Sequence, residues 1–222
     1  MAREREIAKS NISASSDKPF GIILAGGLSS RMGGGDKSLL ALDGTTLLEH
    51  VCARLEPQVS GMALNANGDP VRFAGFGLGV IADTLPDFPG PLAGVLAGME
   101  YAASCGATEI VTVAADTPFY PADLVSRLQA AQAAEGTPLA MAMTPDPERG
   151  LARHPTFGLW PVALAGDLRA ALLEGTRKIV AWTSKHGCAK TRFEVEPYDP
   201  FFNVNTPEDM EQARRMIAEF GL

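Results

Sequence analysis

A glycine-rich segment that carries two basic side chains is the part of this sequence best suited to chemistry. It reads Leu-Ala-Gly-Gly-Leu-Ser-Ser-Arg-Met-Gly-Gly-Gly-Asp-Lys over residues 24–37 and follows the apolar run 20–24. Glycines at the end of a strand let backbone N–H groups approach a polyphosphate closely, because no Cβ stands in the way. Arg31 and Lys37 add the positive charges that triphosphate chemistry needs. The pattern predicts a phosphate-binding loop with Arg31 and Lys37 as catalytic residues, in preference to a flexible surface loop.

Two familiar phosphate-binding motifs do not fit this segment. A P-loop has Gly directly before its Lys-Ser pair, whereas Asp36 precedes Lys37 here. The dinucleotide fingerprint needs Gly-x-Gly-x-x-Gly at the start of a helix, and residues 26–33 lack that spacing. The segment therefore represents a third kind of phosphate loop.

Asp116 is the strongest single candidate for a metal ligand. It follows the apolar run 110–115 and precedes Thr117 and Pro118, a pair that favours a turn. Mg²⁺ typically takes one or two carboxylates together with substrate phosphate oxygens and waters, so one Asp is enough to begin such a site. We therefore expect Mg²⁺ as the cofactor and Asp116 as its ligand and a catalytic residue.

Three further positions share the placement of Asp116 at the end of an apolar run. They are Gly26, Asn65 and Asp83. In an open parallel sheet the carboxyl ends of the strands meet at one edge, where ligands bind. Each residue alone suits the start of a loop equally well, but their joint position predicts one site built by four loops.

The elements that must position these residues can be read from hydrophobic periodicity. Short apolar runs alternate with helical patterns, which predicts an α/β fold with a mostly parallel central sheet covered on both faces. The helical patterns are clearest at 47–55 and 92–104. The expected strands are 20–25, 61–65, 80–83, 110–115, 139–143, 156–160 and 192–195.

The last expected helix has a well-marked start. Thr206 suits the N-cap, Pro207 the first helical position and Asp209 the first turn. Its apolar face is expected to consist of Met210, Ala213, Ile217 and Phe220.

Length and composition bound the organisation of the chain. With 222 residues, of which 46% are hydrophobic, the chain can bury one substantial core, and we expect a single domain over 19–222. Residues 1–18 are charged and then Ser-rich, without a periodic apolar pattern, so they are expected to form a disordered tail.

Charge and cysteine content exclude several classes of function. The net charge is −7 and the basic residues are scattered, which argues against a nucleic-acid surface and favours a small ligand. No apolar run approaches the ~20 residues of a membrane span, and the N-terminus has no signal-peptide core. The three cysteines, Cys52, Cys105 and Cys188, lack metal-ligand spacing. A cytoplasmic location is the expectation.

Several motifs in a fixed order resemble those of one enzyme family. The glycine-rich segment is followed by Pro-Gly-Pro-Leu-Ala-Gly at 89–94, Asp-Thr-Pro at 116–118, Arg-His-Pro-Thr at 153–156 and Asn-Val-Asn-Thr-Pro-Glu at 203–208. Together they resemble the molybdenum cofactor guanylyltransferase family over about residues 20–220. The first motif alone is shared by many sugar-nucleotide and cytidylyl transferases. The resemblance implies a three-layer, Rossmann-like nucleotidyltransferase fold.

The activity that this resemblance implies is transfer of GMP from GTP to the terminal phosphate of molybdopterin, with or without bound molybdenum, releasing pyrophosphate. A cytidylyltransferase or a sugar-nucleotide nucleotidyltransferase of the same fold is the alternative. Guanylyl members typically carry Gly-Gly after Leu-Ala and Thr after the metal Asp, as this chain does with Gly26, Gly27 and Thr117. The sequence leaves open whether a delivery protein brings the cofactor and which molybdoenzymes receive it.

The resemblance also implies roles for single residues. The implied GTP contacts are Leu24, Ala25, Gly26, Gly27, Lys37, Asn65, Asp83 and Asp116. We assign Asp83 and Asn65 to the nucleoside, because a carboxylate can accept both the N1–H and N2–H donors of guanine.

The second substrate is expected to meet the C-terminal half of the chain. Asn203 and Asn205 alternate with the buried-type Val204, so both side chains point the same way and suit hydrogen bonding to a pterin. Arg153 and His154 complete the predicted molybdopterin-binding residues.

Overall fold

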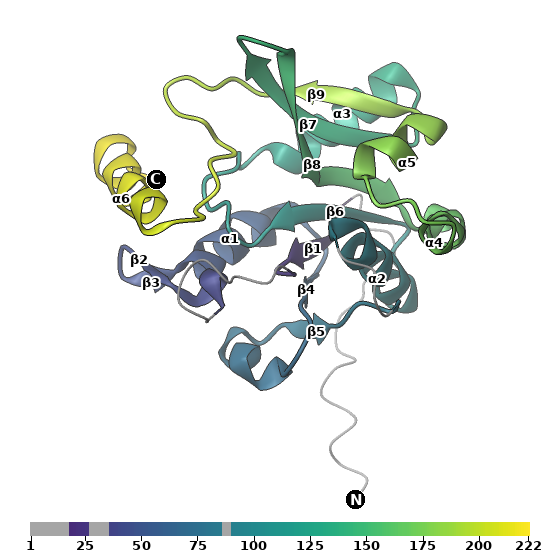
Figure 1. The fold of residues 1–222 in the computed structure, drawn as a ribbon, viewed down its shortest axis with the longest axis horizontal. Helices are drawn as coiled ribbons and strands as arrows, with labels where there is room; N and C mark the ends of the chain where they lie inside the picture. Colours follow the sequence, from purple (N-terminus) through teal and green to yellow (C-terminus); the bar gives the residue numbers. More distant parts are fainter. Residues whose placement is uncertain (1–17, 27–35, 86–89) are drawn as a thin grey trace, which may run out of the picture.

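The computed structural model (Figure 1) describes residues 18–26, 36–85 and 90–222. The expectations for the N-terminal tail as far as residue 17, for Gly27 and for Arg31 lie outside the described residues.

A seven-stranded sheet forms the centre of the described part of the chain, in the order β5-β4-β1-β6-β8-β7-β9. Every neighbouring pair is parallel except the two pairs that β8 makes with β6 and β7, so β8 alone runs against the others. The mostly parallel sheet predicted from the sequence is thus confirmed. The strands are β1 (Phe20–Leu24), β4 (Met62–Asn65), β5 (Gly79–Ile81), β6 (Glu109–Ala114), β7 (Leu139–Asp146), β8 (Gly150–Pro161) and β9 (Cys188–Arg192).

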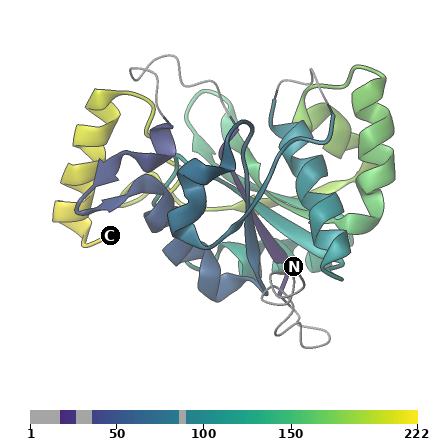
Figure 2. The same cartoon turned by 90° about the horizontal axis from the view of Figure 1, so that it is seen from below.

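Helices cover both faces of this sheet and complete the three layers (Figure 2). On one face α1 (Leu47–Leu55) and α3 (Leu124–Glu135) bury Val51 and Leu128 in a core cluster with β1 and β6. On the other face α2 (Pro91–Ser104), α4 (Ala165–Leu173) and α5 (Ile179–His186) form a second cluster. Leu96 and Trp182, both fully buried, belong to it. Short 3₁₀ helices lie at Lys37–Leu39 (η1), Glu56–Gln58 (η2), Pro70–Phe76 (η3) and Val162–Leu164 (η4).

A third core cluster joins the end of the chain to an early hairpin. The last helix, α6 (Pro207–Phe220), packs on the hairpin of β2 (Ala41–Leu42) and β3 (Thr45–Thr46). Both figures place this pair at the opposite end of the molecule from α4 and α5. Thr206 caps α6 as expected, accepting from the Asp209 N–H at 3.1 Å. The buried face includes Met216, which the expected face omitted, while Ile217 and Phe220 pack at its margin.

The expected strand 192–195 was wrong. The last strand is β9 at Cys188–Arg192, which pairs in parallel with β7. Ala189 and Thr191 alternate inward there, and small or polar residues hide such a period from a reading based on large apolar side chains. The hairpin of β7 and β8 is also longer than expected, since β8 begins at Gly150 instead of residue 156.

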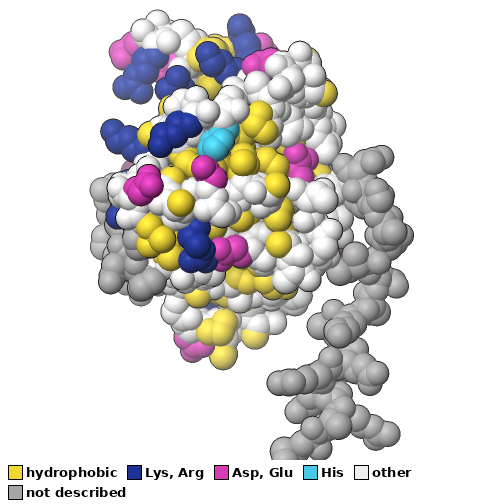
Figure 3. All heavy atoms as spheres, turned by 90° about the vertical axis from the view of Figure 1, so that its right-hand side faces the viewer, with side chains coloured by type: hydrophobic (Ala, Val, Ile, Leu, Met, Phe, Trp, Pro, Cys, Tyr) yellow, Lys and Arg dark blue, Asp and Glu magenta, His cyan; other side chains and the backbone are white. Residues whose placement is uncertain are grey.

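Surface features agree with a chain of mixed charge. The face seen in Figure 3 carries acidic, basic and apolar side chains, with Lys and Arg denser in its upper part. No helix within the described ranges is long and apolar enough to cross a membrane. All three cysteines are free and partly buried. Burial raises the pKa of the Cys52 and Cys188 thiols to about 11, so both are protonated and unreactive at neutral pH.

Candidate active site

Three adjacent strands bring their carboxyl ends to one edge of the sheet. β1 lies between β4 and β6, so Leu24, Asn65 and Ala114 end side by side. Backbone hydrogen bonds extend this register beyond the strands, from Ala25 N–H to the Asn65 carbonyl at 2.9 Å and from Ala115 N–H to the Leu24 carbonyl at 3.0 Å. The chain runs from β1 outward to β4 and β5 and then returns to β6, on the other side of β1. This reversal makes the edge a topological switch point, where open α/β sheets bind ligands.

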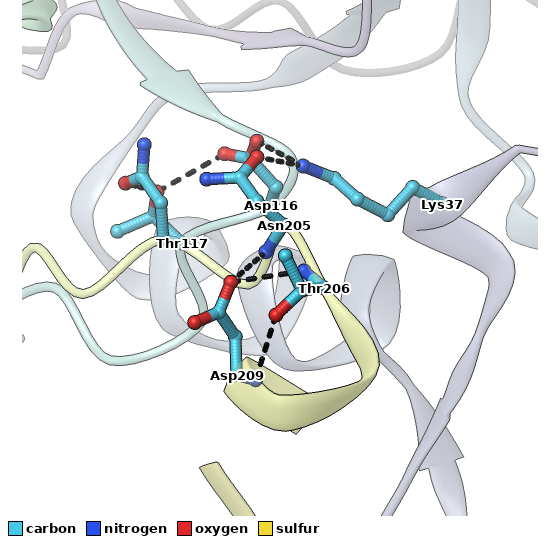
Figure 4. A network of polar contacts seen from close by, with 7 residues as sticks. Lys37, Asp116, Thr117, Asn205, Thr206 and Asp209 are labelled. Carbon is cyan, nitrogen blue, oxygen red and sulfur yellow. Dashed lines mark hydrogen bonds and ion pairs between the residues drawn. The ribbon is translucent and has the colours of Figure 1, made fainter. Parts of the chain in front are cut away.

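One end of this edge is built around Asp116, Lys37 and Asn205 (Figure 4). We call it the phosphate end after the role that the sequence predicts for Lys37. The Lys37 ammonium donates to Asp116 Oδ2 at 2.7 Å and to Asn205 Oδ1 at 2.6 Å. The Lys37 side chain is 15% exposed and that of Asp116 is 26% exposed, so both charges remain accessible to a ligand. An ammonium only donates, so the amide oxygen of Asn205 must face Lys37 and its Nδ2 must point elsewhere. Three segments far apart in the sequence therefore meet at one cation.

Thr117 joins a second asparagine to the same end. Its hydroxyl is fully buried, lies 2.8 Å from Asn203 Oδ1 and 3.2 Å from Asp116 Oδ1, and has one hydrogen to share between these acceptors. Asp116 thus has Lys37 at one carboxylate oxygen and Thr117 at the other. The arrangement fixes the rotation of the carboxylate before any ligand arrives.

Residues 203–205, which we call the Asn-Val-Asn strap, are held in place by their backbone. Val204 is fully buried and its N–H donates to the Asp116 carbonyl at 2.9 Å. The Asp209 carboxylate accepts from the Asn205 and Thr206 N–H groups at 2.8 and 2.9 Å, which ties the strap to the start of α6 (Figure 4). Burial of Val204 leaves both asparagine side chains on the exposed side, as the alternation in the sequence predicts.

The other end of the edge is built around Asp83, and we call it the base end after the role that the sequence predicts for this residue. Asn65 Nδ2 donates to Asp83 Oδ1 at 3.0 Å, and Asn67 Nδ2 donates to Asp83 Oδ2 at 2.8 Å. In return the Asp83 N–H donates to Asn67 Oδ1 at 2.9 Å. Two neutral amides therefore hold the carboxylate, and each of its oxygens keeps a second lone pair for a ligand.

Asn65 is packed as tightly as it is hydrogen-bonded. It is 3% exposed, and its Nδ2 also donates to the Ile81 carbonyl at 3.3 Å. Its amide oxygen lies against Gly94 of α2, where a Cβ would come within 2.2 Å of it. Only glycine leaves room for this contact, which gives the Gly94 of the 89–94 motif a physical role.

An ion pair connects the surroundings of the two ends. Arg72, in η3, pairs through Nε with Asp36 Oδ2 at 2.7 Å, and its Nη2 donates to the Asn67 carbonyl. Asp36 immediately precedes Lys37, while Asn67 holds Asp83. Neither Arg72 nor Asn67 was among the residues expected from the sequence.

Comparison with known proteins identifies the family of this chain. The family model of the MobA-like NTP transferase domain matches residues 21–189. The chain belongs to this family. A molybdenum cofactor guanylyltransferase from Bradyrhizobium sp. (strain ORS 278) is 51% identical over 201 residues, which cover 89% of this chain and 92% of that protein. The resemblance inferred from the motifs is thereby confirmed. The prediction that the chain is a nucleotidyltransferase is confirmed as well.

Solved structures show the same fold for this MobA-like NTP transferase. The molybdopterin-guanine dinucleotide biosynthesis protein A from Archaeoglobus fulgidus matches with a TM-score of 0.67 at 22% identity, over 90% of this chain and 100% of that one. A CMP:2-keto-3-deoxy-manno-octonic acid synthetase complexed with CTP also gives 0.67, at 17% identity, over 92% and 99% of the two chains. Because a CTP-bound protein shares the fold equally well, the fold does not select the base. Selection must come from side chains.

The residues predicted for the second substrate lie in different surroundings. Asn203 and Asn205 belong to the phosphate end. His154 is half-buried: its Nε2 is 2.8 Å from Thr144 Oγ1, and its ring stacks on Phe201 at 4.2 Å between centroids. Burial lowers the pKa of His154, with a smaller opposing effect from Asp199. Arg153 is exposed, next to His154 on β8. The structure therefore gives His154 a packing contact with Phe201, two residues before the strap, and its role in binding stays a prediction.

Asn67 and Arg72 were not predicted from the sequence. It indicated Thr117 only as a feature that favours GTP over CTP. A signal for Asn67 was present, because Asn65-Ala66-Asn67 repeats the alternation of the Asn-Val-Asn strap with a buried centre, Ala66 at 3% exposure. Arg72 carries no such signal. Its partner Asp36 is 36 residues away in the sequence and meets Arg72 only in the folded chain.

Proposed function

We propose that this protein transfers the GMP moiety of GTP to the terminal phosphate of molybdopterin and releases pyrophosphate. The reaction class comes from the family, and the substrates from the relatives named molybdenum cofactor guanylyltransferase. The observation that carries the proposal is the cluster of Lys37, Asp116 and Asn205 at the carboxyl edge of the sheet, with contacts of 2.7 and 2.6 Å.

The chemical step needs no nucleophile from the protein. An oxygen of the molybdopterin phosphate attacks the α-phosphorus of GTP, and a new P–O bond forms. The bond from the α-phosphorus to the oxygen bridging to the β-phosphorus breaks, and pyrophosphate leaves with that electron pair. The attacking phosphate is already ionised, so catalysis depends on alignment and on neutralising negative charge.

Lys37 is the described residue best placed to neutralise that charge. Its ammonium is held by Asp116 and Asn205, with 15% of the side chain exposed. A preorganised cation in a partly dry site stabilises a developing charge without reorganisation during the step. Arg31 and the glycine N–H groups remain sequence-based candidates for the same task.

The donor set at the phosphate end suits Mg²⁺. The described residues contain no group of three or more His, Cys, Asp or Glu side chains that could cage a metal, but Mg²⁺ does not require one. One accessible carboxylate, Asp116, beside a phosphate site is enough, because the nucleotide and waters complete the shell. When bound, Mg²⁺ would supply charge neutralisation and orientation of the phosphates. Asp116 would hold the ion, while Lys37, its neighbour at 2.7 Å, would face the same phosphates.

The base end supplies a basis for choosing guanine. Asp83 offers the remaining lone pairs of both oxygens to the N1–H and N2–H donors of guanine. Cytosine presents a single exocyclic amino group and no ring N–H, so it leaves part of this acceptor pair unused. A partly desolvated carboxylate that stays unpaired penalises the wrong base.

The acceptor is assigned to the side of the phosphate end that the strap forms. Asn203 and Asn205 turn their oxygens toward Thr117 and Lys37, so their Nδ2 groups are the donors left for a phosphate or a pterin. The exposed Arg153 on β8 is a further candidate for the acceptor's charge.

Nucleotide binding tests the proposal most directly. Calorimetric titrations of GTP, CTP and ATP, with and without Mg²⁺, would compare the wild type with Asp116→Ala and with the surface control Lys190→Met on β9. We expect binding selective for GTP that weakens without Mg²⁺ or Asp116 and persists in the control. A preference for CTP would instead support a cytidylyltransferase, and no nucleotide binding would overturn the proposal.

A further inference from the structure

Arg72 contacts a neighbour of each end of the nucleotide site, Asp36 at one and Asn67 at the other. We propose that Arg72 is a positioning residue that holds the base end and the phosphate end at a fixed separation, so that one GTP molecule reaches both without rearrangement. The inference rests on the proposed function, because it concerns the same nucleotide site. No other described residue links the two ends through side-chain contacts on each side.

On the phosphate side, Arg72 holds the residue before Lys37. Asp36 stands at the N-cap of η1 (Lys37–Leu39), where an Asp side chain commonly accepts from the first N–H groups of its own helix. Here the side chain makes no capping bond and instead pairs with Arg72 Nε at 2.7 Å. A local bond has thus been replaced by one between segments far apart in the sequence. Its effect is to fix the backbone from which the Lys37 side chain departs.

On the base side, Arg72 binds the backbone of Asn67, whose side chain is hydrogen-bonded to Asp83. Its Nη2 donates to the carbonyl of Asn67, whose side chain makes two reciprocal bonds with Asp83 at 2.8 and 2.9 Å. Both the backbone and the side chain of Asn67 are therefore committed, one to Arg72 and the other to the base end.

Arg72 itself is well anchored. It lies in η3, whose start is capped by Asp69 accepting from the Val71 N–H at 3.0 Å. Its guanidinium lies 4.9 Å from the ring centroid of Phe73, which is 1% exposed in the core. Gly68 leaves room for it, since a Cβ there would lie 3.1 Å from Nη1. The Arg72 side chain is 33% exposed and that of Asp36 is 26% exposed, so the ion pair is partly shielded from solvent.

The chemistry of the two partners explains why arginine is needed. A carboxylate and a backbone carbonyl must be held at once, in directions fixed by the folds of two separate segments. The planar fork of a guanidinium presents several N–H groups in a rigid arrangement, whereas an ammonium is a point charge on a flexible stem. Lysine would keep the charge and lose the fixed geometry.

This role predicts a distinctive binding pattern. A ligand that touches one end alone does not sense the separation of the two ends, whereas GTP must satisfy both in the same complex. Loss of preorganisation therefore lowers the affinity only for a ligand that spans both ends of the site. Guanosine reports on the base end and pyrophosphate reports on the phosphate end.

The test compares Arg72→Met, Arg72→Lys and Asp36→Asn with the wild type. We expect each to weaken GTP binding roughly tenfold, while guanosine and pyrophosphate affinities, measured by ligand-observed NMR, change less than about twofold. The double variant Arg72→Met/Asp36→Asn should bind GTP no more weakly than Arg72→Met, because both changes break the same connection. Asp36→Asn keeps the test valid if the Arg72 variants fold poorly.

Arg127→Met is the matched control. Arg127 also donates to a backbone carbonyl, that of Arg192, and its guanidinium also lies against an aromatic ring, 4.1 Å from the ring centroid of Phe193. It has no part in the site, so its loss should leave GTP affinity unchanged.

Three results would overturn the inference. GTP affinity in Arg72→Met could stay within about twofold of the wild type. Guanosine affinity could fall in parallel with GTP, which indicates collapse of the base end, or pyrophosphate affinity could do so, which indicates direct contact with phosphate. Wild-type titration with GTP is done first. If the wild type binds no GTP, the proposed function fails as well; if it binds and the variants do too, only the inference on Arg72 fails.

Discussion

The two ends of the site each hold an aspartate in a fixed orientation, but their asparagines take opposite hydrogen-bonding roles. At each end an aspartate at the carboxyl edge of the sheet is held at both of its oxygens, and an Asn-x-Asn segment with a buried centre takes part. At the base end the asparagines donate to Asp83. At the phosphate end they accept, Asn205 from Lys37 and Asn203 from Thr117. The same residue type therefore leaves different groups free for a ligand.

The ends also differ in charge and in how they are assembled. Asp83 is held by neutral amides only 16 and 18 residues away in the sequence. Asp116 is held by a cation 79 residues away, and the strap that supports this cation is 168 residues from it. Neutral partners close in the sequence suit recognition of a base whose shape and charge do not change during the reaction. A cationic partner suits stabilisation of negative charge that develops in the transition state. The base end should therefore affect mainly KM and the phosphate end mainly kcat.

The largest expected effect comes from removing charge at the phosphate end. Lys37→Met or Asp116→Asn should lower kcat by roughly 10²–10³, as loss of a single oxyanion-stabilising donor does. Pyrophosphate release with GTP and molybdopterin measures this rate. Lys190→Met removes an exposed lysine from β9 and should retain wild-type turnover. A variant of Lys37 with unchanged kcat would show that the two ends do not divide the work in this way.

A change at the base end should appear in the other kinetic parameter. Asp83→Asn would keep one acceptor oxygen, set its NH2 group against the donor of either Asn65 or Asn67, and remove an acceptor for guanine. We expect KM for GTP to rise roughly 10- to 100-fold, the cost of losing hydrogen bonds to a charged group, with a smaller change in kcat. The preference for GTP over CTP should narrow in the same measurements. A loss confined to kcat would contradict the assignment of Asp83 to the base.

Two glycine-to-alanine substitutions, one against Asn65 and one at an open position, test the packing of the base end. In Gly94→Ala the new Cβ would meet Asn65 Oδ1 at 2.2 Å and Leu24 at 3.0 Å, so a buried side chain or α2 must shift. Such overpacking typically costs about 1–3 kcal/mol of unfolding free energy. A Cβ added at Gly166 in α4 would meet nothing within 4 Å, so Gly166→Ala should stabilise by up to about 1 kcal/mol. Urea denaturation measures both, and equal effects would show that Gly94 is not packed as described.

The comparison of the two ends also shows how far the sequence can predict them. Local patterns worked well: α1 has the predicted bounds of residues 47–55, and Thr206 caps α6 as expected. The positions of Gly26, Asn65, Asp83 and Asp116 at strand ends could be predicted because a parallel sheet brings the carboxyl ends of its strands to one edge. These features depend on periodicity or on the order of neighbouring residues, which a sequence displays directly.

Contacts between distant segments were less accessible. Nothing near Asp36 indicates that its side chain leaves its own helix to pair with Arg72. The contacts of the strap with Lys37 and Thr117 were not predicted, because they depend on the return of the chain after β9, where the Val204 N–H donates to the Asp116 carbonyl. β9 was misplaced because its inward residues, Ala189 and Thr191, are small or polar. Such details depend on which segments fold together, a property of the whole chain.

The smallest expected effect concerns the support of the strap and its dependence on pH. Phe201, two residues before Asn203, is 3% exposed and stacks on His154. Burial lowers the pKa of His154 below its usual 6.5 in the folded protein, and the charge of Asp199 only partly opposes this. Between the folded and unfolded pKa values the unfolded chain binds more protons, so acid favours unfolding.

Stability should accordingly fall as the pH drops below about 6.5, by roughly 1.4 kcal/mol for each unit that separates the two pKa values of His154. Urea denaturation at pH values of about 7.5 and 5.5, on either side of that pKa, measures the loss. It should shrink in His154→Gln and persist in His50→Gln, whose ring contacts Thr45 and the Leu42 carbonyl instead. Since the strap contacts Lys37, acid should also weaken pyrophosphate binding more in the wild type than in His154→Gln, a comparison in which protonation of pyrophosphate itself cancels. Equal weakening in the two proteins would mean that His154 does not support the phosphate end.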